Sequence, residues 1–361
     1  MLSMYRFLMI GAAPFVSFLI VSIAHGVTLQ PGDVVVGVDL GTGKNPDFAL
    51  LEIDPATGNR TVISDNSIGT GPSLYYNYVS DIGIDFPAIP YISYQADGSL
   101  LVTVASPNSS TGSALLRVDP ATGDRTLVSD ELANSGPPVY YVAARDFGNS
   151  ILVGGPQGTA LIDPATGNRT AFSAVNVSGF AIDGSNIYAA SADQASVYAI
   201  NASTGTPTLI SGQGVGTGPD LHRPQDVALN SAGNLLVLDG HTVYNVDPIT
   251  GDRTIISSDA AGSTVGTGPD LLVGAFRLAV APDGTIFTTG FMAPDTVSIA
   301  SIDPLTGNRT IISDATIGTG PIFNLTTAVS GIMVVPNVPE PSTLALAALG
   351  GLLLVAWQRR K

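Results

Sequence analysis

The chain has 361 residues and no cysteine, which excludes disulfide bonds, thiolate metal sites and a cysteine nucleophile. Its net charge of −15 repels phosphate groups, so we expect no nucleic-acid binding. An apolar chain with 41 glycines and 25 prolines indicates many turns between short strands.

Residues 1–26 have the features of a secretory signal. Arg6 precedes an apolar run over residues 7–24, and small residues stand at Ala24 and Gly26. This order predicts a signal helix that is cleaved after one of these two small residues. The alternative is an uncleaved membrane anchor, because the apolar run is long for a signal.

A nine-residue motif recurs six times along the chain. Five copies contain Asp-Pro-x-Thr-Gly-Asn/Asp-Arg-Thr, and the remaining copy has lost the proline and the arginine. The starts of the copies lie about 50 residues apart on average. The copies are IDPATGNRT (53–61), VDPATGDRT (118–126), IDPATGNRT (162–170), INASTGTPT (200–208), VDPITGDRT (246–254) and IDPLTGNRT (302–310).

The chemistry of the motif is that of a β-hairpin turn. In the first copy, Asp54 can accept hydrogen bonds from backbone N–H groups two residues on, Pro55 presets φ, and Gly58 supplies the positive φ that closes the loop. An alternating apolar segment precedes the motif and a β-branched segment follows it. Two strand-like runs around such a turn predict an antiparallel hairpin.

Two more strand-like runs lie upstream of several hairpins, most clearly in residues 225–247. They give strands over 226–229 and 235–238 before a third strand at 242–246. Each unit therefore comprises four short antiparallel strands. Six such units predict an all-β fold, a six-bladed β-propeller over residues 27–336.

The two ends of this region complement one another. Residues 33–39 open the first unit without an inner strand before them, and residues 325–336 follow the last hairpin with no hairpin of their own. We expect the second segment to supply the missing inner strand of blade 1. That pairing would close the ring and leave no open sheet edge there.

Gly-Thr-Gly-Pro links follow the outer strands in several units, whereas blades 3 and 4 depart most from the pattern and lack this link. Together with RPQDVALNSAGNLLVLD at 223–239, the pattern resembles that of NHL-type six-bladed propellers. The resemblance covers roughly residues 27–336. The four links stand at residues 69–72, 216–219, 266–269 and 318–321.

The motif arginine begins the outermost strand of five blades. A charge in that place discourages edge-to-edge pairing of sheets, so we expect the arginine to protect an exposed edge. The alternative is a repeated ligand site. The five residues are Arg60, Arg125, Arg169, Arg253 and Arg309.

The C-terminal tail has three parts: a Pro-Glu-Pro motif, an apolar run over residues 344–357 and a basic end. The run predicts a short apolar helix of 14 residues, fewer than the roughly 20 that span the hydrocarbon of a bilayer. The motif and the basic end comprise Pro339, Glu340, Pro341, Arg359, Arg360 and Lys361.

This tail closely resembles the PEP-CTERM sorting signal of exported bacterial proteins, and we assign it to residues 337–361. The resemblance implies that an exosortase-type enzyme recognises the tail and cleaves it near residues 339–341. It also implies export across the inner membrane, anchoring by the helix at least before processing, and an association with extracellular polysaccharide and biofilm. The alternative is a simple tail anchor.

Propellers bind ligands where the inner strands and their loops surround the axis. Asp226 and Arg277 occupy equivalent places in neighbouring blades, which predicts either an ion pair that faces a ligand or a salt bridge that only lines the channel. The candidate ligand face consists of Tyr91, Arg145, His222, Asp226, Asp239 and Arg277.

No catalytic or metal-binding set accompanies this face in the sequence. The three histidines do not have the spacing of zinc ligands, and no Gly-x-Ser-x-Gly motif occurs. We therefore predict no catalytic residue, no metal site and no cofactor. The abundance of aspartate leaves a structural calcium ion as an alternative, and Asp81 and Asp85 lie close together in the sequence.

These features favour a non-catalytic exported propeller that binds polysaccharide or another envelope protein. The first alternative is an enzyme of the metal-dependent lactonase or polysaccharide lyase type, and the second is a structural spacer. Lactonase-type propellers, which resemble this fold, hold a channel metal with Glu, Asn and Asp. Glu52 and Glu131 are the only glutamates of the body, and both lie near hairpins, which argues against that enzyme.

Overall fold

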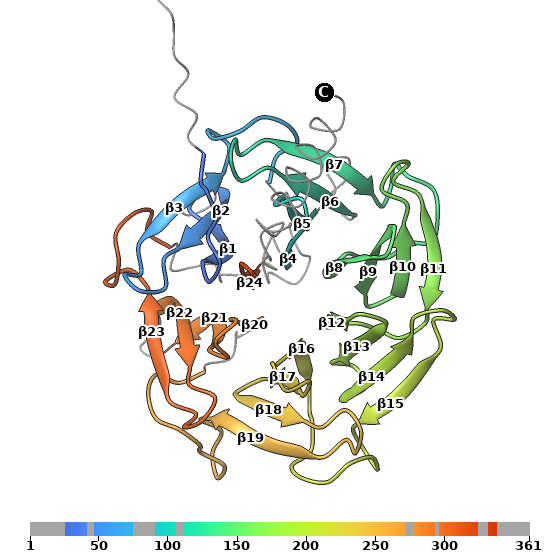
Figure 1. Ribbon diagram of the computed structural model, residues 1–361, viewed down its shortest axis with the longest axis vertical. Coiled ribbons are helices and arrows are strands. Elements are labelled where there is room, and N and C mark those ends of the chain that lie inside the picture. Colours follow the sequence, from blue (N-terminus) through green and yellow to red (C-terminus); the bar gives the residue numbers. More distant parts are fainter. Residues whose placement is uncertain are drawn as a thin grey trace, which may run out of the picture.

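The computed structural model describes residues 26–41, 47–74, 91–105, 112–271, 277–292, 296–323 and 331–337. Six four-stranded antiparallel sheets stand around a central axis like the blades of a propeller (Figure 1), so the predicted fold and blade count are confirmed. From the axis outward, blade 1 comprises β24 (Ile332–Val334), β1 (Val34–Asp39), β2 (Phe48–Ile53) and β3 (Arg60–Ser64).

The other five blades follow in chain order, each running from its inner to its outer strand. Blade 2 comprises β4 (Tyr91–Tyr94), β5 (Leu100–Ala105), β6 (Ser113–Val118) and β7 (Arg125–Asp130). Blade 3 comprises β8 (Ala143–Phe147), β9 (Ser150–Gly155), β10 (Gly158–Ile162) and β11 (Arg169–Ser173). Blade 4 comprises β12 (Gly179–Asp183), β13 (Asn186–Ser191), β14 (Ser196–Asn201) and β15 (Pro207–Ser211). Blade 5 comprises β16 (Pro224–Leu229), β17 (Leu235–Asp239), β18 (Thr242–Val246) and β19 (Arg253–Ser258). Blade 6 comprises β20 (Leu278–Val280), β21 (Ile286–Met292), β22 (Thr296–Ile302) and β23 (Arg309–Ser313).

The ring closes as the sequence predicts, with the C-terminal strand β24 pairing antiparallel to β1. Val334 lies opposite Val34 and Ile332 opposite Val36. No helix in the described ranges is long and apolar enough to cross a membrane. The predicted signal at 1–26 lies almost wholly outside those ranges, as do the apolar run and the basic end of the tail.

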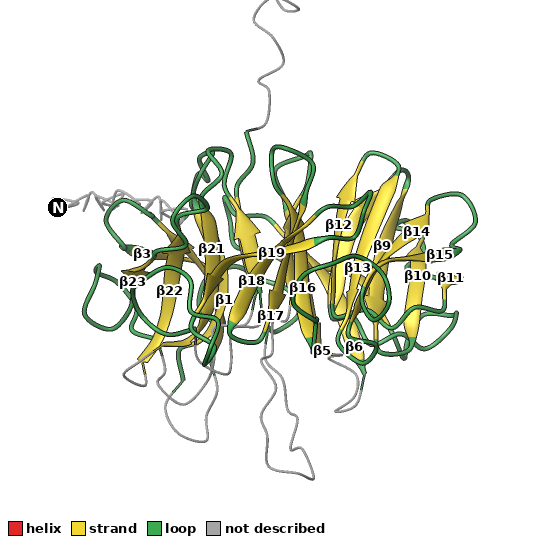
Figure 2. Ribbon diagram, turned by 90° about the horizontal axis from the view of Figure 1, so that it is seen from below, coloured by secondary structure: helices red, strands yellow, loops and turns green. Residues whose placement is uncertain are grey.

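Seen from the side, the blades stand next to one another with loops at both ends of their strands (Figure 2). The core lies between the blades, and its residues come from strands that face each other across each blade boundary. Blades 4 and 5, for example, share a cluster in which Val197 and Ile210 pack with Val227 and Leu235. Strands whose two faces both meet neighbouring blades are apolar on both faces, as in β1, where every residue is buried.

The hairpin turn of the motif forms as its chemistry predicts. In the first copy, the backbone N–H of Ala56 donates to Asp54 Oδ1 at 2.8 Å, and Gly58 has a φ of +73°. The N–H of Gly58 also donates to the carbonyl oxygen of Asp54 at 2.8 Å. Short-range hydrogen bonds therefore set the register of β2 and β3.

These hydrogen bonds predict a loss of stability in acid. Bonds from threonine side chains and backbone N–H groups lower the pKa of Asp54, Asp124, Asp252 and Asp303. A carboxylate with a lowered folded-state pKa stabilises the protein above its unfolded pKa, and this contribution disappears as the pH falls through the folded-state pKa. We expect the melting temperature to fall steadily below about pH 4.

The matched control exchanges two of these aspartates for the residue that other blades already use. Asn59, Asn168 and Asn308 stand where Asp124 and Asp252 stand in blades 2 and 5. The double variant Asp124→Asn, Asp252→Asn should therefore fold normally and lose less stability between pH 7 and pH 3 in differential scanning calorimetry. An acid response identical to that of the unchanged protein would contradict this account.

The motif arginine does not lie at an exposed edge, so the prediction that its charge protects a sheet edge is wrong. All five arginine residues are only 5–6% exposed. Each reaches into the link that leaves the preceding blade. The guanidinium donates to carbonyl oxygens of that link, which are partly buried.

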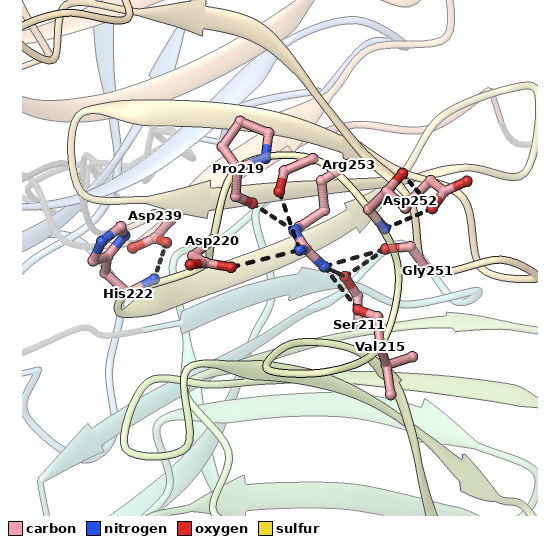
Figure 3. A network of polar contacts seen from close by, with 11 residues as sticks. Ser211, Val215, Pro219, Asp220, His222, Asp239, Gly251, Asp252 and Arg253 are labelled. Atoms are coloured by element: carbon pink, nitrogen blue, oxygen red, sulfur yellow. Dashed lines mark hydrogen bonds and ion pairs between the residues drawn. The ribbon is translucent and has the colours of Figure 1, made fainter.

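Arg253 at the start of β19 illustrates the arrangement (Figure 3). Its Nε donates to the carbonyl oxygen of Pro219 at 2.6 Å, and its Nη1 donates to Ser211 Oγ at 2.7 Å and to the carbonyl oxygen of Val215 at 2.9 Å. Ser211 Oγ in turn donates to the carbonyl oxygen of Gly251 at 2.7 Å. We call a motif arginine together with these acceptors in the preceding blade the arginine clamp.

The clamp recurs at five of the six blade boundaries. In every case the arginine Nε donates to the carbonyl oxygen of a proline. The arginine backbone N–H donates to the carbonyl oxygen of the residue two positions before that proline. The Asn or Asp that precedes the arginine accepts bonds from the same link. The Nε–proline pairs are Arg60–Pro321, Arg125–Pro72, Arg169–Pro137, Arg253–Pro219 and Arg309–Pro269.

The link at residues 216–219 follows β15 of blade 4, so the prediction that blade 4 lacks this link is wrong. The glycines of the Gly-Thr-Gly-Pro link are required by the close approach of the next blade. A Cβ added at Gly216 would lie 1.9 Å from the carbonyl oxygen of Gly251. A Cβ added at Gly218 would lie 2.1 Å from the carbonyl oxygen of Arg253. The nine-residue motif of one blade and the link that leaves the preceding blade thus pack directly against each other.

The boundary between blades 3 and 4 lacks the clamp. Thr206 and Pro207 stand in place of the Asn/Asp-Arg pair, and proline has no N–H to donate. Ser173, the equivalent of Ser211, has a buried hydroxyl without a hydrogen-bond partner in the described structure. Apolar contacts hold this boundary instead, with Val177 packed in the cluster that joins the two blades.

We therefore expect the ring to open first at this boundary. In hydrogen exchange followed by mass spectrometry, peptides covering residues 169–178 should exchange at least about tenfold faster than peptides covering 211–220, because the opening free energy is lower by about 1.4 kcal/mol or more. The second set, across a clamped boundary, is the internal control. Equal protection at both boundaries would show that the clamp does not govern local opening.

Candidate functional site

Four residues of the candidate face lie around the propeller axis. Three of them belong to a layer of six equivalent positions, one per blade, in or just before the inner strand. The strand registers align Asp226 with Arg277, as the sequence predicts, and with four further residues. Three members are large or charged, and three are small. In blade order, the layer consists of Gly331, Tyr91, Ala143, Gly179, Asp226 and Arg277.

The small members leave room for the large ones. A Cβ added at Gly179 would lie 2.1 Å from Asp226 Oδ1, so any larger residue there would displace the carboxylate. The three small residues of the layer are therefore needed to make room for the three large or charged ones.

Arg277 bonds to three other blades across the axis. Its Nη1 donates to the carbonyl oxygens of Ser178 at 2.8 Å and Gln225 at 3.0 Å, and its Nη2 donates to that of Val142 at 3.0 Å. Ser178, Gln225 and Val142 each stand immediately before the layer residue of their own blade. One guanidinium from blade 6 therefore ties together blades 3, 4 and 5.

Tyr91 fills the axis from blade 2. Its hydroxyl donates to the carbonyl oxygen of Phe180 in blade 4 at 3.2 Å. The guanidinium carbons of Arg145 and Arg277 lie 5.1 Å and 5.7 Å from the centre of its ring, within the range of cation–π attraction. Burial raises the pKa of this phenol.

Asp226 joins blade 5 to blade 6. Its Oδ2 accepts the backbone N–H of Leu278 at 3.0 Å, and its Oδ1 accepts that of Val227 at 2.9 Å. Burial raises the pKa of this carboxyl group, and the positive charge of Arg277 opposes the rise. The carboxylate is therefore held by two backbone donors and a neighbouring cation.

His222 and Asp239 form a separate arrangement at the side of blade 5. Asp239 Oδ2 accepts the backbone N–H of His222 at 2.6 Å, and its Oδ1 accepts that of Arg223 at 2.7 Å. The carboxylate thereby orders the loop that enters β16, while the His222 side chain is exposed. The structure thus brings together Tyr91, Arg145, Asp226 and Arg277, while Asp239 bonds to the backbone at His222 and Arg223.

The axial layer offers little surface to a ligand. Tyr91 is 4% exposed, Asp226 is 2% exposed and Arg277 is 8% exposed. Within the part of the chain that the structure describes, no group of three or more His, Asp or Glu side chains lies close enough together to hold a metal ion. Asp81 and Asp85, the residues considered for calcium, lie outside that part.

Sequence reasoning identified the charged members of the layer but missed their partners. The acceptors of Arg277 are backbone carbonyl oxygens, and any residue type supplies one. The small residues Ala143 and Gly179 carry the only sequence signal, since they stand where an inner strand would otherwise place a large apolar side chain.

The C-terminal residues 337–361 match the PEP-CTERM protein-sorting motif. This match confirms the resemblance inferred from the tail and indicates an exported protein that exosortase sorts to the cell surface or the extracellular space. No curated protein matches the chain in sequence.

Among solved structures, the nidogen/laminin complex matches with a TM-score of 0.55 and 11% identity, covering 84% of this chain and 97% of that one. TolB from Acinetobacter baumannii matches with a TM-score of 0.52 and 12% identity, covering 85% and 67%. A protein of unknown function from Bacteroides caccae matches with a TM-score of 0.50 and 13% identity, covering 85% and 99%. At such low identity, these likenesses show the fold alone.

Proposed function

We propose that this protein is a non-catalytic binding protein of the cell surface or the extracellular matrix, and that its partner is extracellular polysaccharide. One observation carries the proposal: the polar groups on the propeller axis are buried and bonded to the protein's own backbone. Groups that are already satisfied in this way are poorly placed to act as an acid, a base or a nucleophile.

The sorting motif supports the cellular setting of this proposal. A protein released at the outside of the cell meets polysaccharide and other envelope proteins before any cytoplasmic substrate. A net charge of −15 disfavours acidic polymers as partners, because like charges repel over the whole surface.

Thermal unfolding of the purified exported protein tests the proposal. We would measure the melting temperature alone, with calcium, and with neutral and acidic oligosaccharides. A ligand present at 100 times its dissociation constant stabilises the folded state by about 2.7 kcal/mol, which gives a measurable shift.

A rise with an oligosaccharide that remains intact supports the binding protein. Cleavage of the oligosaccharide, or a calcium-dependent rise accompanied by lactone hydrolysis, would overturn it in favour of an enzyme. The absence of any shift across the panel would overturn it in favour of a structural spacer.

A further inference from the structure

A groove on the hairpin side of the ring combines an open volume with an uncharged lining. It has a volume of about 600 Å³ and lies between the sheet of blade 4 and the hairpin of blade 5. Its lining contains no carboxylate, ammonium, guanidinium or imidazole group. This is unusual in a chain of net charge −15, and two other grooves on that side contain Asp283 in one case and Asp97 with Asp119 in the other.

Tyr188 on β13 gives the groove an accessible aromatic ring. The residues at the same register in the other five blades are buried aliphatic or phenylalanine side chains, whereas Tyr188 is only partly buried. Its cross-strand neighbour is the small Ala199, and its ring packs partly against the apolar cluster between blades 4 and 5 and lines the groove with its remaining surface. The equivalent buried residues are Val35, Leu101, Leu152, Leu236 and Phe287.

Two carboxamides lie beside this ring. Asn186 and Asn201 are directly opposite each other on β13 and β14, and both are exposed. Asn201 Oδ1 accepts the backbone N–H groups of Ser203 and Thr204, and its amide nitrogen donates to no residue that the structure describes. The Asn186 carboxamide and the Tyr188 hydroxyl make no hydrogen bond to any residue that the structure describes.

One of the places where blade 4 departs from the repeat, Asn201, contributes to the uncharged lining of the groove. Asn201 replaces the aspartate that begins the other five hairpins, and Thr206 and Pro207 replace the Asn/Asp-Arg pair. Only the first exchange lies in the groove, where it replaces a carboxylate by an uncharged carboxamide.

We infer that this groove binds a chain of uncharged sugar rings. The aromatic ring of Tyr188 offers an apolar face for the C–H groups of one ring, and the two asparagines can donate to and accept from its hydroxyl groups. Ile249, which is 93% exposed, supplies an apolar wall on the blade 5 side. A few polar groups placed around an apolar surface are the usual composition of a ligand site of this size.

This inference rests on the proposed function, since it names the site and the class of polysaccharide. Isothermal titration calorimetry of the purified exported protein would use a neutral glucan or mannan hexasaccharide and, separately, an oligogalacturonate. We expect Tyr188→Ala to weaken binding of the neutral oligosaccharide at least tenfold and Tyr188→Phe to retain most of the affinity. Asn201→Asp, which restores the repeat residue, should also weaken it.

Tyr94→Ala is the matched control, because Tyr94 lines the groove that contains Asp97 and Asp119. It should leave the affinity unchanged. If the neutral oligosaccharide binds the Tyr188→Ala and unchanged proteins equally, the groove assignment fails while the proposed function stands. If no oligosaccharide binds the unchanged protein, the proposed function itself fails. Tighter binding of the acidic oligosaccharide would overturn the assignment to a neutral ligand.

Discussion

Replacing Arg253 by alanine is expected to lower the free energy of unfolding by about 3–5 kcal/mol. The guanidinium donates to the carbonyl oxygens of Pro219 and Val215 and to the Ser211 hydroxyl between blades 4 and 5, and its removal takes a charged donor away from three buried or partly buried acceptors. Arg253→Lys should recover only a part of the loss, because one ammonium group cannot reach acceptors that diverge around a planar guanidinium. Urea unfolding followed by circular dichroism measures the difference.

Arg117 provides the control for the loss of a positive charge. Its Nη1 pairs with Asp97 Oδ2 at 2.7 Å, and its side chain is 33% exposed. A surface ion pair of this kind contributes about 0–1 kcal/mol, so Arg117→Ala should be nearly neutral. Equal destabilisation by Arg117→Ala and Arg253→Ala would show that net charge, and not the clamp, is responsible.

The blades and hairpins could be predicted because their determinants are local. The bond from Ala56 N–H to Asp54 spans two residues, and the positive φ of Gly58 belongs to a single residue. Turn chemistry of this kind recurs in each copy, so the repetition itself predicts the number of blades.

The role of the motif arginine could not be predicted, because its partners are distant in the sequence. Arg60 donates to the carbonyl oxygen of Pro321, which is 261 residues away, across the point where the ring closes. The sequence does contain both partners, since the motif and the Gly-Thr-Gly-Pro link recur together. It does not say which link meets which arginine until the order of the blades around the ring is known.

The charged residues of the axial layer could be predicted, but their partners could not, because these partners are also distant in the sequence. Equivalent positions identify Asp226 and Arg277 as neighbours, but the carbonyl oxygen of Val142 lies 135 residues from the arginine that it binds. Backbone acceptors leave no trace in the residue types. A cation whose partners are carbonyl oxygens therefore resembles a ligand-binding cation when only the sequence is considered.

Removal of Arg277 is the second change for which we expect a large effect. Arg277→Ala leaves three carbonyl oxygens of blades 3, 4 and 5 without their donor and deprives the buried carboxylate of Asp226 of a neighbouring positive charge. We expect a loss of about 3–5 kcal/mol in the free energy of unfolding. Without Arg277 the pKa of Asp226 in the folded protein would rise further. The contribution of Asp226 to the free energy of unfolding would then be most favourable below its unfolded pKa of about 4. It would be lost as the pH rises through the folded-state pKa.

A second substitution separates the two causes of this loss. In Arg277→Ala, Asp226→Asn, no carboxylate remains to be buried, and the asparagine oxygen can still accept the N–H of Leu278. The double variant should therefore be more stable at pH 7 than Arg277→Ala alone, while the two should differ less at pH 4. Urea unfolding at both pH values measures the coupling. Additive effects of the two substitutions at pH 7 would mean that Arg277 acts only through the carbonyl oxygens and that the charge of Asp226 is balanced without it.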